Sequence, residues 1–225
     1  MTKRTYRQYC PLARTMDILG ERWTVLMIRE LLLGPRRFKD LLEALDGMGT
    51  NLLSERLKML EAEGLAQRRT LPAPAGSAVY ELTERGRGLE PAMVELARWG
   101  VESLGKPREG EAFRPSWLAL TLKATFNAEL ARGIHEVYEF RVDDTVFHAR
   151  VDDGHLTITD GEAQRPDLVF AANAETFVAV GLRRVSALDA VRRGKLKAEG
   201  PPESLLRCVE ILGLPMPAQS SSALG

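Results

Sequence analysis

Three polar side chains at helical spacing give this sequence its clearest candidate for binding chemistry. Asn51, Ser54 and Lys58 fall on one side of a helix predicted over residues 50–63, and leucines form an apolar stripe on the other side. The amide, hydroxyl and ammonium groups can bind base edges or phosphates, so we expect this face to contact DNA. By itself the pattern is more typical of an ordinary surface helix, and the neighbouring segments shift the interpretation toward DNA binding. The leucines of the stripe are Leu53, Leu57 and Leu60.

The segments before this helix must hold it on a core. Apolar periodicity predicts three further helices, and the turn formers of residues 46–49 connect the last of them to the helix at 50–63. Thr50 is expected to cap that helix, and Gly64 is expected to end it in a left-handed conformation. Two helices joined by a short glycine-bearing turn, the second with a polar outer face, are typical of a helix-turn-helix. The three preceding helices are predicted over residues 11–19, 21–33 and 38–45.

The segments after the helix predict a wing. Residues 65–71 and 78–83 have strand character, and the proline-rich residues 72–77 form a loop between them. A helix over residues 83–104 follows, and its large apolar side chains favour a dimer interface. Arginine and lysine side chains around the wing and the turn are expected to neutralise phosphates. These candidates are Arg36, Arg37, Lys39, Arg68 and Arg69.

Arg56 lies at the edge of the apolar stripe of the same helix. At that position it would either brace the fold through an acidic partner or contact DNA. We keep it among the DNA-binding candidates with both alternatives open. Lys58→Ala and Arg69→Ala are expected to weaken operator binding and lower its salt dependence.

Several motifs within residues 10–100 appear in the order found in one family. Through these motifs the chain resembles the HxlR-type winged-helix transcription regulators, which are relatives of the MarR group. The resemblance implies a bacterial homodimer that binds operator DNA with one winged helix per half-site. The matching residues are Cys10-Pro11-Leu12, Gly20-Glu21-Arg22-Trp23-Thr24, Arg29-Glu30-Leu31, Gly34-Pro35-Arg36-Arg37-Phe38, Asn51-Leu52-Leu53-Ser54-Glu55-Arg56-Leu57, Leu60-Glu61-Ala62-Glu63-Gly64-Leu65 and Tyr80-Glu81-Leu82-Thr83.

The two cysteines do not form a disulfide framework. Cys10 precedes a predicted helix and lies near Arg7 and Arg14, an environment that favours a reactive thiolate. In some HxlR-type regulators a cysteine at this place senses oxidants or electrophiles, whereas a lone cysteine is otherwise a small packed residue. Cys208 lies in an apolar helical segment and is expected in the core.

The second half of the chain predicts an α+β layer in which an antiparallel sheet has its helices on one side. Residues 105–115 are a charged linker rich in proline and glycine, and a helix is expected over residues 116–131. Aspartate-containing turns at residues 143–144, 153–154 and 160–161 indicate hairpins. Strands are predicted at 134–142, 145–152, 155–159, 167–171 and 195–198, and helices at 174–182, 186–193 and 202–212.

Two segments of this half resemble sterol-carrier-protein-like (SCP2-type) lipid-binding domains. They are Arg165-Pro166-Asp167-Leu168-Val169-Phe170 and residues 186–200. The resemblance implies an apolar tunnel between sheet and helices. Six aromatic side chains are candidates to line such a pocket, although aromatic residues at these positions form the core in most folds. A basic cluster around residues 183–197 is either a solvated face or a site for an acidic ligand or DNA. The aromatic candidates are Trp117, Phe126, Phe140, Phe147, Phe170 and Phe177.

Other classes of function find little support. The 225 residues are 44% hydrophobic with a formal net charge of zero, which argues against a large nucleic-acid-binding surface. There is neither a membrane-spanning apolar run nor a signal peptide, so a cytoplasmic protein is expected. His135, His148 and His155 do not combine with carboxylates at metal-ligand spacing. With no catalytic or phosphate-binding motif, we expect neither an enzyme nor a cofactor.

The sequence thus predicts a dimeric transcription regulator whose second domain binds an apolar small molecule as effector. A redox or electrophile switch through Cys10, with the second domain used only for dimerisation, is the alternative. A lipid carrier that has lost DNA binding is a third, and the intact polar face of residues 51–58 argues against it. The expected domains are 1–104 (winged helix and dimerisation), 105–115 (linker), 116–213 (sterol-carrier-like) and 214–225 (tail).

Overall fold

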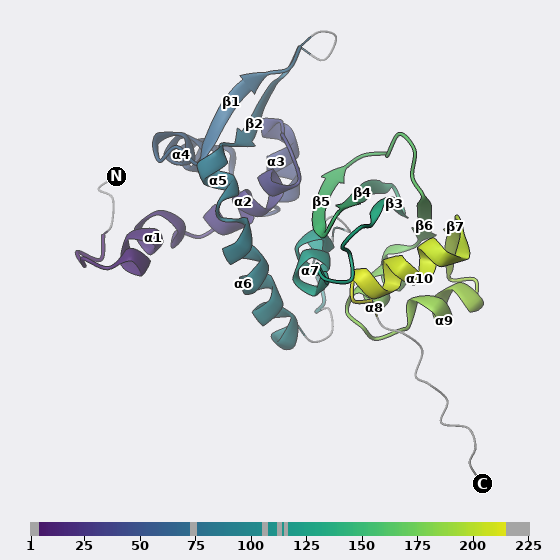
Figure 1. The fold of residues 1–225 in the computed structure, drawn as a ribbon. Helices are drawn as coiled ribbons and strands as arrows, with labels where there is room; N and C mark the ends of the chain where they lie inside the picture. The colour runs from purple at the N-terminus through teal and green to yellow at the C-terminus, as the bar shows by residue number, and fades with distance from the viewer. Residues whose placement is uncertain (1–4, 73–75, 105–107, 112–113, 115–116, 215–225) are drawn as a thin grey trace. The chain divides into compact units, whose positions relative to one another are not determined.

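The computed structural model describes residues 5–72, 76–104, 108–111, 114 and 117–214. The chain divides into two compact units, Met1–Met93 and Val94–Gly225, which are described one at a time (Figure 1). Most of the expected linker, and the expected tail after Leu214, lie outside the described residues. Within the described part, no helix has the length and apolar character needed to cross a membrane.

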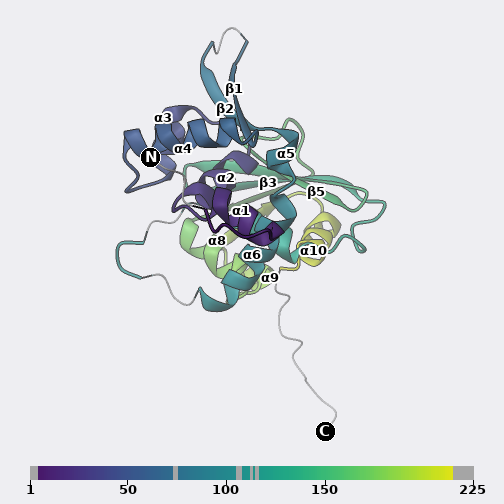
Figure 2. The same ribbon diagram turned by 90° about the vertical axis from the view of Figure 1, so that its left-hand side faces the viewer.

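The first unit is a winged helix, as the sequence predicts. The leucine stripe of α4 is fully buried, as are Met27, Ile28 and Leu41, because i, i+4 and i+7 positions share one face of a helix and turn together toward the core. The β1–β2 hairpin projects from the helices as the wing (Figures 1 and 2). The elements are α1 (Pro11–Leu19), α2 (Thr24–Leu32), α3 (Phe38–Ala44), α4 (Thr50–Ala62), β1 (Ala66–Thr70), β2 (Ala78–Leu82), α5 (Glu84–Arg87) and α6 (Glu90–Ser103), which crosses the boundary between the units.

Three local predictions in this region need correction. Thr50 is the first residue of α4 rather than its cap, because the cap position is held by Gly49 without a side-chain hydrogen bond. The second helix begins at Thr24 instead of residue 21, since Trp23 adopts a left-handed conformation with φ of 79°. The predicted helix over 83–104 is broken at residues 88–89 into α5 and α6. Gly64 follows α4 with φ of 66°, as predicted.

The second unit is an α+β layer whose five-stranded sheet has the order β5-β4-β3-β6-β7. Three of its strand pairs are antiparallel, as predicted, but β3 and β6 run parallel, so the sheet is mixed. The turn at residues 160–161 is therefore not a hairpin; it leads the chain from the edge strand β5 back to the far side of β3. The elements are α7 (Leu118–Thr125), β3 (His135–Val142), β4 (Thr145–Asp152), β5 (His155–Asp160), β6 (Leu168–Ala172), α8 (Ala174–Gly181), α9 (Ala187–Arg192), β7 (Leu196–Glu199) and α10 (Pro202–Ile211).

The predicted helix over residues 116–131 ends early, at Thr125. There the chain turns because the Thr125 hydroxyl donates to the Leu212 carbonyl oxygen at 2.7 Å, and the Asn127 backbone N–H donates to the Ile211 carbonyl oxygen at 2.7 Å. These bonds satisfy carbonyl groups at the end of α10. They also join the end of α7 to the end of α10.

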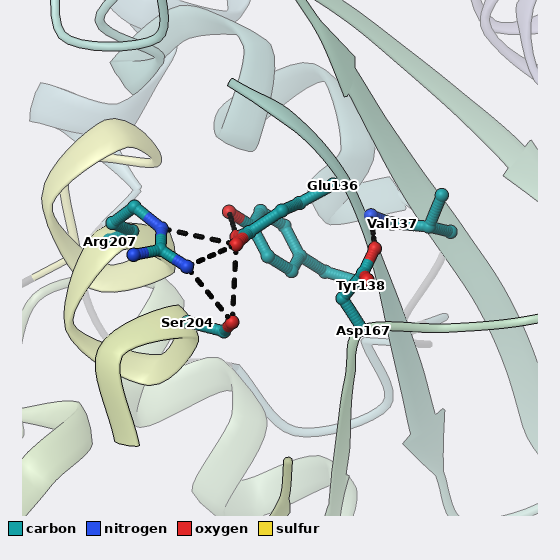
Figure 3. A network of polar contacts seen from close by, with 6 residues as sticks. All are labelled: Glu136, Val137, Tyr138, Asp167, Ser204 and Arg207. Atoms are coloured by element: carbon teal, nitrogen blue, oxygen red, sulfur yellow. Dashed lines mark hydrogen bonds and ion pairs between the residues drawn. The ribbon is translucent and has the colours of Figure 1, made fainter. Parts of the chain in front are cut away.

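A polar network fixes α10 on the sheet (Figure 3). The Glu136 carboxylate accepts hydrogen bonds from Ser204 at 3.1 Å, from Tyr138 at 2.6 Å and from Arg207. Nearby, the Val137 N–H donates to the Asp167 carboxylate at 2.8 Å, where β3 and β6 begin to pair. Tyr138 is completely buried, so its hydroxyl depends on Glu136 for a partner.

This network predicts a pH-dependent stability. Partial burial opposes ionisation of Glu136, but hydrogen bonds from Arg207, Tyr138 and Ser204 outweigh it and lower the pKa of this carboxyl below its ordinary 4.5. A folded-state pKa below that of the unfolded chain adds stability above the unfolded pKa, and this stability is lost as pH falls through the folded pKa. We expect Glu136→Gln to lower the free energy of unfolding by about 1–3 kcal/mol at neutral pH. The difference should vanish in acid below the folded-state pKa.

Urea unfolding at a series of pH values checks this expectation. Glu129→Gln is the matched control, because its ion pair with Arg132 is exposed on both sides and should contribute less than about 1 kcal/mol at any pH. If the loss of unfolding free energy in Glu136→Gln stays constant from neutral to acid pH, the stabilisation does not depend on ionisation of Glu136.

Candidate DNA-binding surface and apolar cavity

The outer face of α4 is available for binding. Asn51 and Lys58 are exposed and Ser54 is half-buried. None of the three side chains has a hydrogen bond or ion pair with another residue in the part of the chain that the structure describes. Together they present an amide, a hydroxyl and an ammonium group on a helix whose opposite face is anchored by three buried leucines. This geometry suits insertion of the helix into a major groove.

Arg56 is held within the fold. Its Nη2 lies 3.0 Å from Glu21 Oε2 and its Nη1 lies 3.7 Å from Glu55 Oε1, and its side chain is only 15% exposed. Two residues after Glu21, the Trp23 ring lies against Gly47, where an added Cβ would be 3.9 Å from Trp23 Cη2. The contacts tie α4 and the turn before it to the α1–α2 connection. Of the two alternatives for Arg56, this geometry favours the brace.

A double-mutant cycle tests whether the ion pair between Arg56 and Glu21 stabilises the fold. Alanine replacements at Glu21 and Arg56 should reveal a coupling energy near the upper end of the range of about 0.2–1 kcal/mol for ion pairs, because Arg56 is largely buried. The exposed Lys39–Glu43 pair of α3 is the control, with an expected coupling of about 0.3–0.5 kcal/mol. Urea unfolding supplies these energies. If Arg56 instead binds phosphate, Arg56→Ala will lower the salt dependence of DNA binding and the coupling will be absent.

The two arginines of the wing have different environments. Arg69 donates from Nε and Nη2 to the Glu81 carboxylate at 3.0 and 2.9 Å, and Gln67 donates to the same group at 2.9 Å. The hydrogen bond from Arg69 is the main reason why the pKa of Glu81 is lowered. Arg68 points to the opposite face of β1, because strand side chains alternate. It is exposed and has no side-chain partner among the described residues.

The remaining basic candidates have local contacts. Arg36 joins the wing through backbone hydrogen bonds with Tyr80 at 2.9 and 2.7 Å, and its Nε donates to the Glu30 carbonyl oxygen at 3.4 Å. Arg37 Nε donates to Ser77 Oγ at 3.0 Å, and Lys39 pairs with Glu43 at 3.4 Å on an exposed helix face. Among the DNA-binding candidates, the side chains without such contacts to the described residues are Asn51, Ser54, Lys58 and Arg68, and these remain the strongest candidates.

Sequence reasoning missed the residues that position this surface. Glu21 braces Arg56, and Glu81 holds Arg69 and Gln67 in the wing. The place of Arg56 beside the apolar stripe indicated an acidic partner, but no local pattern identified which one. The left-handed Trp23 carried no sequence signal, because bulky residues seldom adopt a positive φ.

The second unit contains a small apolar cavity of about 20 Å³, which is space for about one water molecule. Three of the six aromatic candidates line it: Phe140, Phe170 and Phe177. Trp117, Phe126 and Phe147 are not among its lining residues. The others that line it are Leu122, Val180, Gly181, Ala187, Leu196 and Leu214.

Four phenylalanine rings, three from the sheet and one from α8, pack against one another. The Phe140 ring stacks on Phe147 and Phe170, with centroids 5.0 and 5.3 Å apart. Phe177 from α8 meets Phe140 and Phe147 edge-on at 5.8 and 5.7 Å. These are favourable aromatic geometries. These rings therefore form a packed core next to the small cavity beside α8.

The other predicted groups lie apart from these two sites. Cys10 is half-buried at the start of α1, whereas Cys208 is completely buried and burial raises the pKa of its thiol. His135 Nδ1 lies 2.5 Å from Asp152 Oδ1, while His148 and His155 contact backbone carbonyl oxygens. Across the described ranges, no three His, Cys, Asp or Glu side chains are arranged to hold a metal ion.

Each half of the chain matches the model of a known family. Residues 18–107 match the HxlR-like helix-turn-helix family, and residues 119–213 match the SCP-2 sterol transfer family. Both resemblances expected from the sequence are thereby confirmed.

Relatives among known proteins match the first half. YvaP, an uncharacterised HTH-type transcriptional regulator of Bacillus subtilis (strain 168), is 38% identical over 42% of this chain and 89% of its own length. YodB, an HTH-type transcriptional regulator of the same strain, is 36% identical over 40% of this chain and 81% of its own length. The solved structure of YodB in its reduced form is 32% identical, with a TM-score of 0.39, and the match covers 45% of this chain and all of that chain.

Proposed function

Because the chain belongs to the HxlR-like helix-turn-helix family, whose matching relatives are named as transcriptional regulators, we propose that it binds operator DNA through the outer face of α4. The observation that carries this proposal is a set of side chains on that face that have no hydrogen bond or ion pair with any residue that the structure describes: Asn51, Ser54 and Lys58. The helix enters the major groove, and Arg68 of the wing neutralises a phosphate beside it. Such a protein acts in the cytoplasm, where operator DNA is found.

The active form in this proposal is a homodimer. Support comes from apolar side chains exposed on two helices. On α6, Leu96 is 57% and Trp99 is 71% exposed, and on α1, Leu12 is 68% exposed. Large exposed apolar side chains on one helix are typical of a protein–protein interface. A two-fold dimer places two copies of α4 on two operator half-sites.

The second domain supplies the response to an effector in this proposal. The SCP-2 family match and the apolar cavity beside α8 favour an apolar small molecule. A cavity of about 20 Å³ must enlarge to hold it, so the ligand would select a more open conformation. Leu122 of α7 lines the cavity, and two residues later the Ala124 carbonyl oxygen accepts hydrogen bonds from Arg98 of α6 at 3.0 and 2.7 Å. Opening the cavity would thus shift α6.

Selection of genomic DNA fragments by the purified protein tests the DNA-binding proposal. Sequencing of the retained fragments should reveal a palindromic motif with half-sites about 10 base pairs apart, or a multiple of that spacing. The Asn51→Ala/Lys58→Ala double variant changes no buried residue. It shows whether enrichment depends on the outer face of α4, and it should not enrich the motif. Failure of the wild-type protein to enrich any motif would contradict the proposal.

A redox switch at Cys10 is the second candidate. It is favoured by the position of this thiol, half-buried at the N-terminal end of α1, in contrast with the inaccessible Cys208. We expect iodoacetamide at neutral pH to label the native protein at Cys10 and to leave Cys208 unmodified until urea unfolds the chain. Mass spectrometry of the peptides measures both sites, and an unlabelled Cys10 in the native protein would eliminate this candidate.

A further inference from the structure

Cationic side chains are concentrated in one short segment of the second unit. Residues 183–197 contain six of them against the single acidic residue Asp189, although the whole chain has equal numbers of acidic and basic residues. All six are exposed. We name this set the basic cluster; it consists of Arg183, Arg184, Arg192, Arg193, Lys195 and Lys197.

The fold brings the cluster together on three consecutive elements. Arg183 and Arg184 follow the last turn of α8, Arg192 and Arg193 end α9, and α9 packs against both α8 and β7. A positive φ of 59° at Arg183 and of 66° at Gly194 turns the chain sharply after each helix. The six residues of α9, with a length of about 9 Å, lead from the first arginine pair to the second along the chain.

Five of the six charges of the cluster are weakly compensated within the described residues. Arg192 Nη1 lies 3.4 Å from Asp189 Oδ1 in a pair whose arginine is 70% exposed. Arg183, Arg193, Lys195 and Lys197 have no side-chain partner among the described residues. Cations at helix C-termini interact favourably with the helix dipole, which explains why the fold tolerates them there. It does not account for Lys195 and Lys197 beyond the helix.

Two observations limit the kind of partner. None of the large apolar side chains exposed in the described part of the chain lies within residues 183–197, so the cluster lacks the apolar anchors of a membrane-binding surface. Leu196 faces the apolar cavity, and strand alternation turns Lys197 to the opposite face of the sheet. Guanidinium groups bind phosphate oxygens in a bidentate manner. A nucleic-acid backbone therefore fits the cluster better than a membrane or the head group of a ligand in the cavity.

We propose that the basic cluster is a second DNA-binding surface, which contacts phosphates without reading sequence. It extends the DNA-binding function beyond the winged helix. Because both surfaces belong to one chain, binding through α4 raises the local concentration of DNA phosphates around the cluster. The second domain then contributes to affinity and to the salt dependence of binding, while sequence preference stays with α4.

The test measures binding of the full-length protein to a 40-base-pair duplex of random sequence by fluorescence anisotropy over a range of salt concentrations. The variants are Arg183→Gln/Arg184→Gln and Arg192→Gln/Arg193→Gln. Each should make the slope of log K against log salt less steep by about 0.9 for every phosphate that the variant no longer neutralises, hence by up to about two. Arg150→Gln/Arg165→Gln is the matched control; it removes two exposed charges from the same unit outside the cluster and should leave the slope unchanged.

Slopes for the cluster variants equal to that of the control would overturn the proposal. So would cluster-dependent binding to phosphatidylglycerol vesicles with an unchanged DNA slope, which would assign the surface to membranes. Failure of the proposed function is distinguishable, because it would appear as unchanged operator binding by Lys58→Ala. Circular dichroism of all variants confirms that the compared proteins are folded.

Discussion

Phe140→Ala should lower the free energy of unfolding of the second unit by about 3–5 kcal/mol, the range found for truncation of a buried phenylalanine. The Phe140 ring is 2% exposed and contacts the rings of Phe147, Phe170 and Phe177. Truncation of Phe140 removes the favourable free energy of burying the ring and its packing against three aromatic neighbours. The truncation also enlarges the adjacent cavity. Urea unfolding followed by circular dichroism measures the destabilisation.

Two control variants make this result specific. Phe140→Leu retains most of the apolar volume and should cost less than Phe140→Ala. Leu130→Ala removes an exposed side chain of the same unit and should change stability by less than about 0.5 kcal/mol. A Phe140→Ala variant as stable as Leu130→Ala would show that the phenylalanine cluster is not the core of this unit.

Lys58→Ala/Arg68→Ala should weaken operator binding by about 10- to 100-fold and make the salt slope less steep by about two. Both side chains are exposed and lack partners in the described structure, so the substitutions remove charge without disturbing another residue. Anisotropy titrations with the operator at several salt concentrations measure both quantities. Arg132→Ala, an exposed and ion-paired cation of the second unit, serves as control. Wild-type affinity and slope in the double variant would refute the assignment of these two residues.

The expectation for Arg69 changes in light of the structure. The sequence groups Arg69 with Arg68, because both are basic residues at the base of the wing. Of these two arginines, Arg68 has no side-chain partner within the described residues, whereas the register of β1 and β2 places Glu81 beside Gln67 and Arg69. Arg69→Ala therefore removes a cation and also releases the Glu81 carboxylate near the proposed DNA surface. A loss of affinity in that variant alone would not identify a phosphate contact.

The periodic features of the sequence were sufficient to predict most elements of the fold. The leucine stripe of α4, the wing strands and the alternating strands of the second half have strong local patterns, and the structure shows them close to the predicted positions. The parallel pairing of β3 with β6 was not predictable in this way, because it depends on where the chain returns after residue 161. The early end of α7 likewise depends on contacts with residues 211 and 212, which are distant in sequence.

The sequence predicted the candidate site about as far as it predicted the fold. Polar residue types at helical spacing identified the outer face of α4, and composition identified the aromatic candidates of the second domain. Neither pattern could show that Glu21 holds Arg56 or that Phe147 packs in the core while Phe170 lines a cavity. Those distinctions arise from tertiary contacts between residues far apart in the chain.

The most direct test of the central claim is a titration of wild-type protein and Asn51→Ala against the selected operator and a set of its single-base-pair variants. If α4 reads bases through Asn51, the wild-type protein should lose about 1–3 kcal/mol of binding free energy at the base pair that Asn51 contacts. Asn51→Ala should then bind the operator and that one variant equally well, while it still discriminates at the other positions. Retention by Asn51→Ala of the full wild-type discrimination at every position would contradict the claim that this residue of α4 reads the operator.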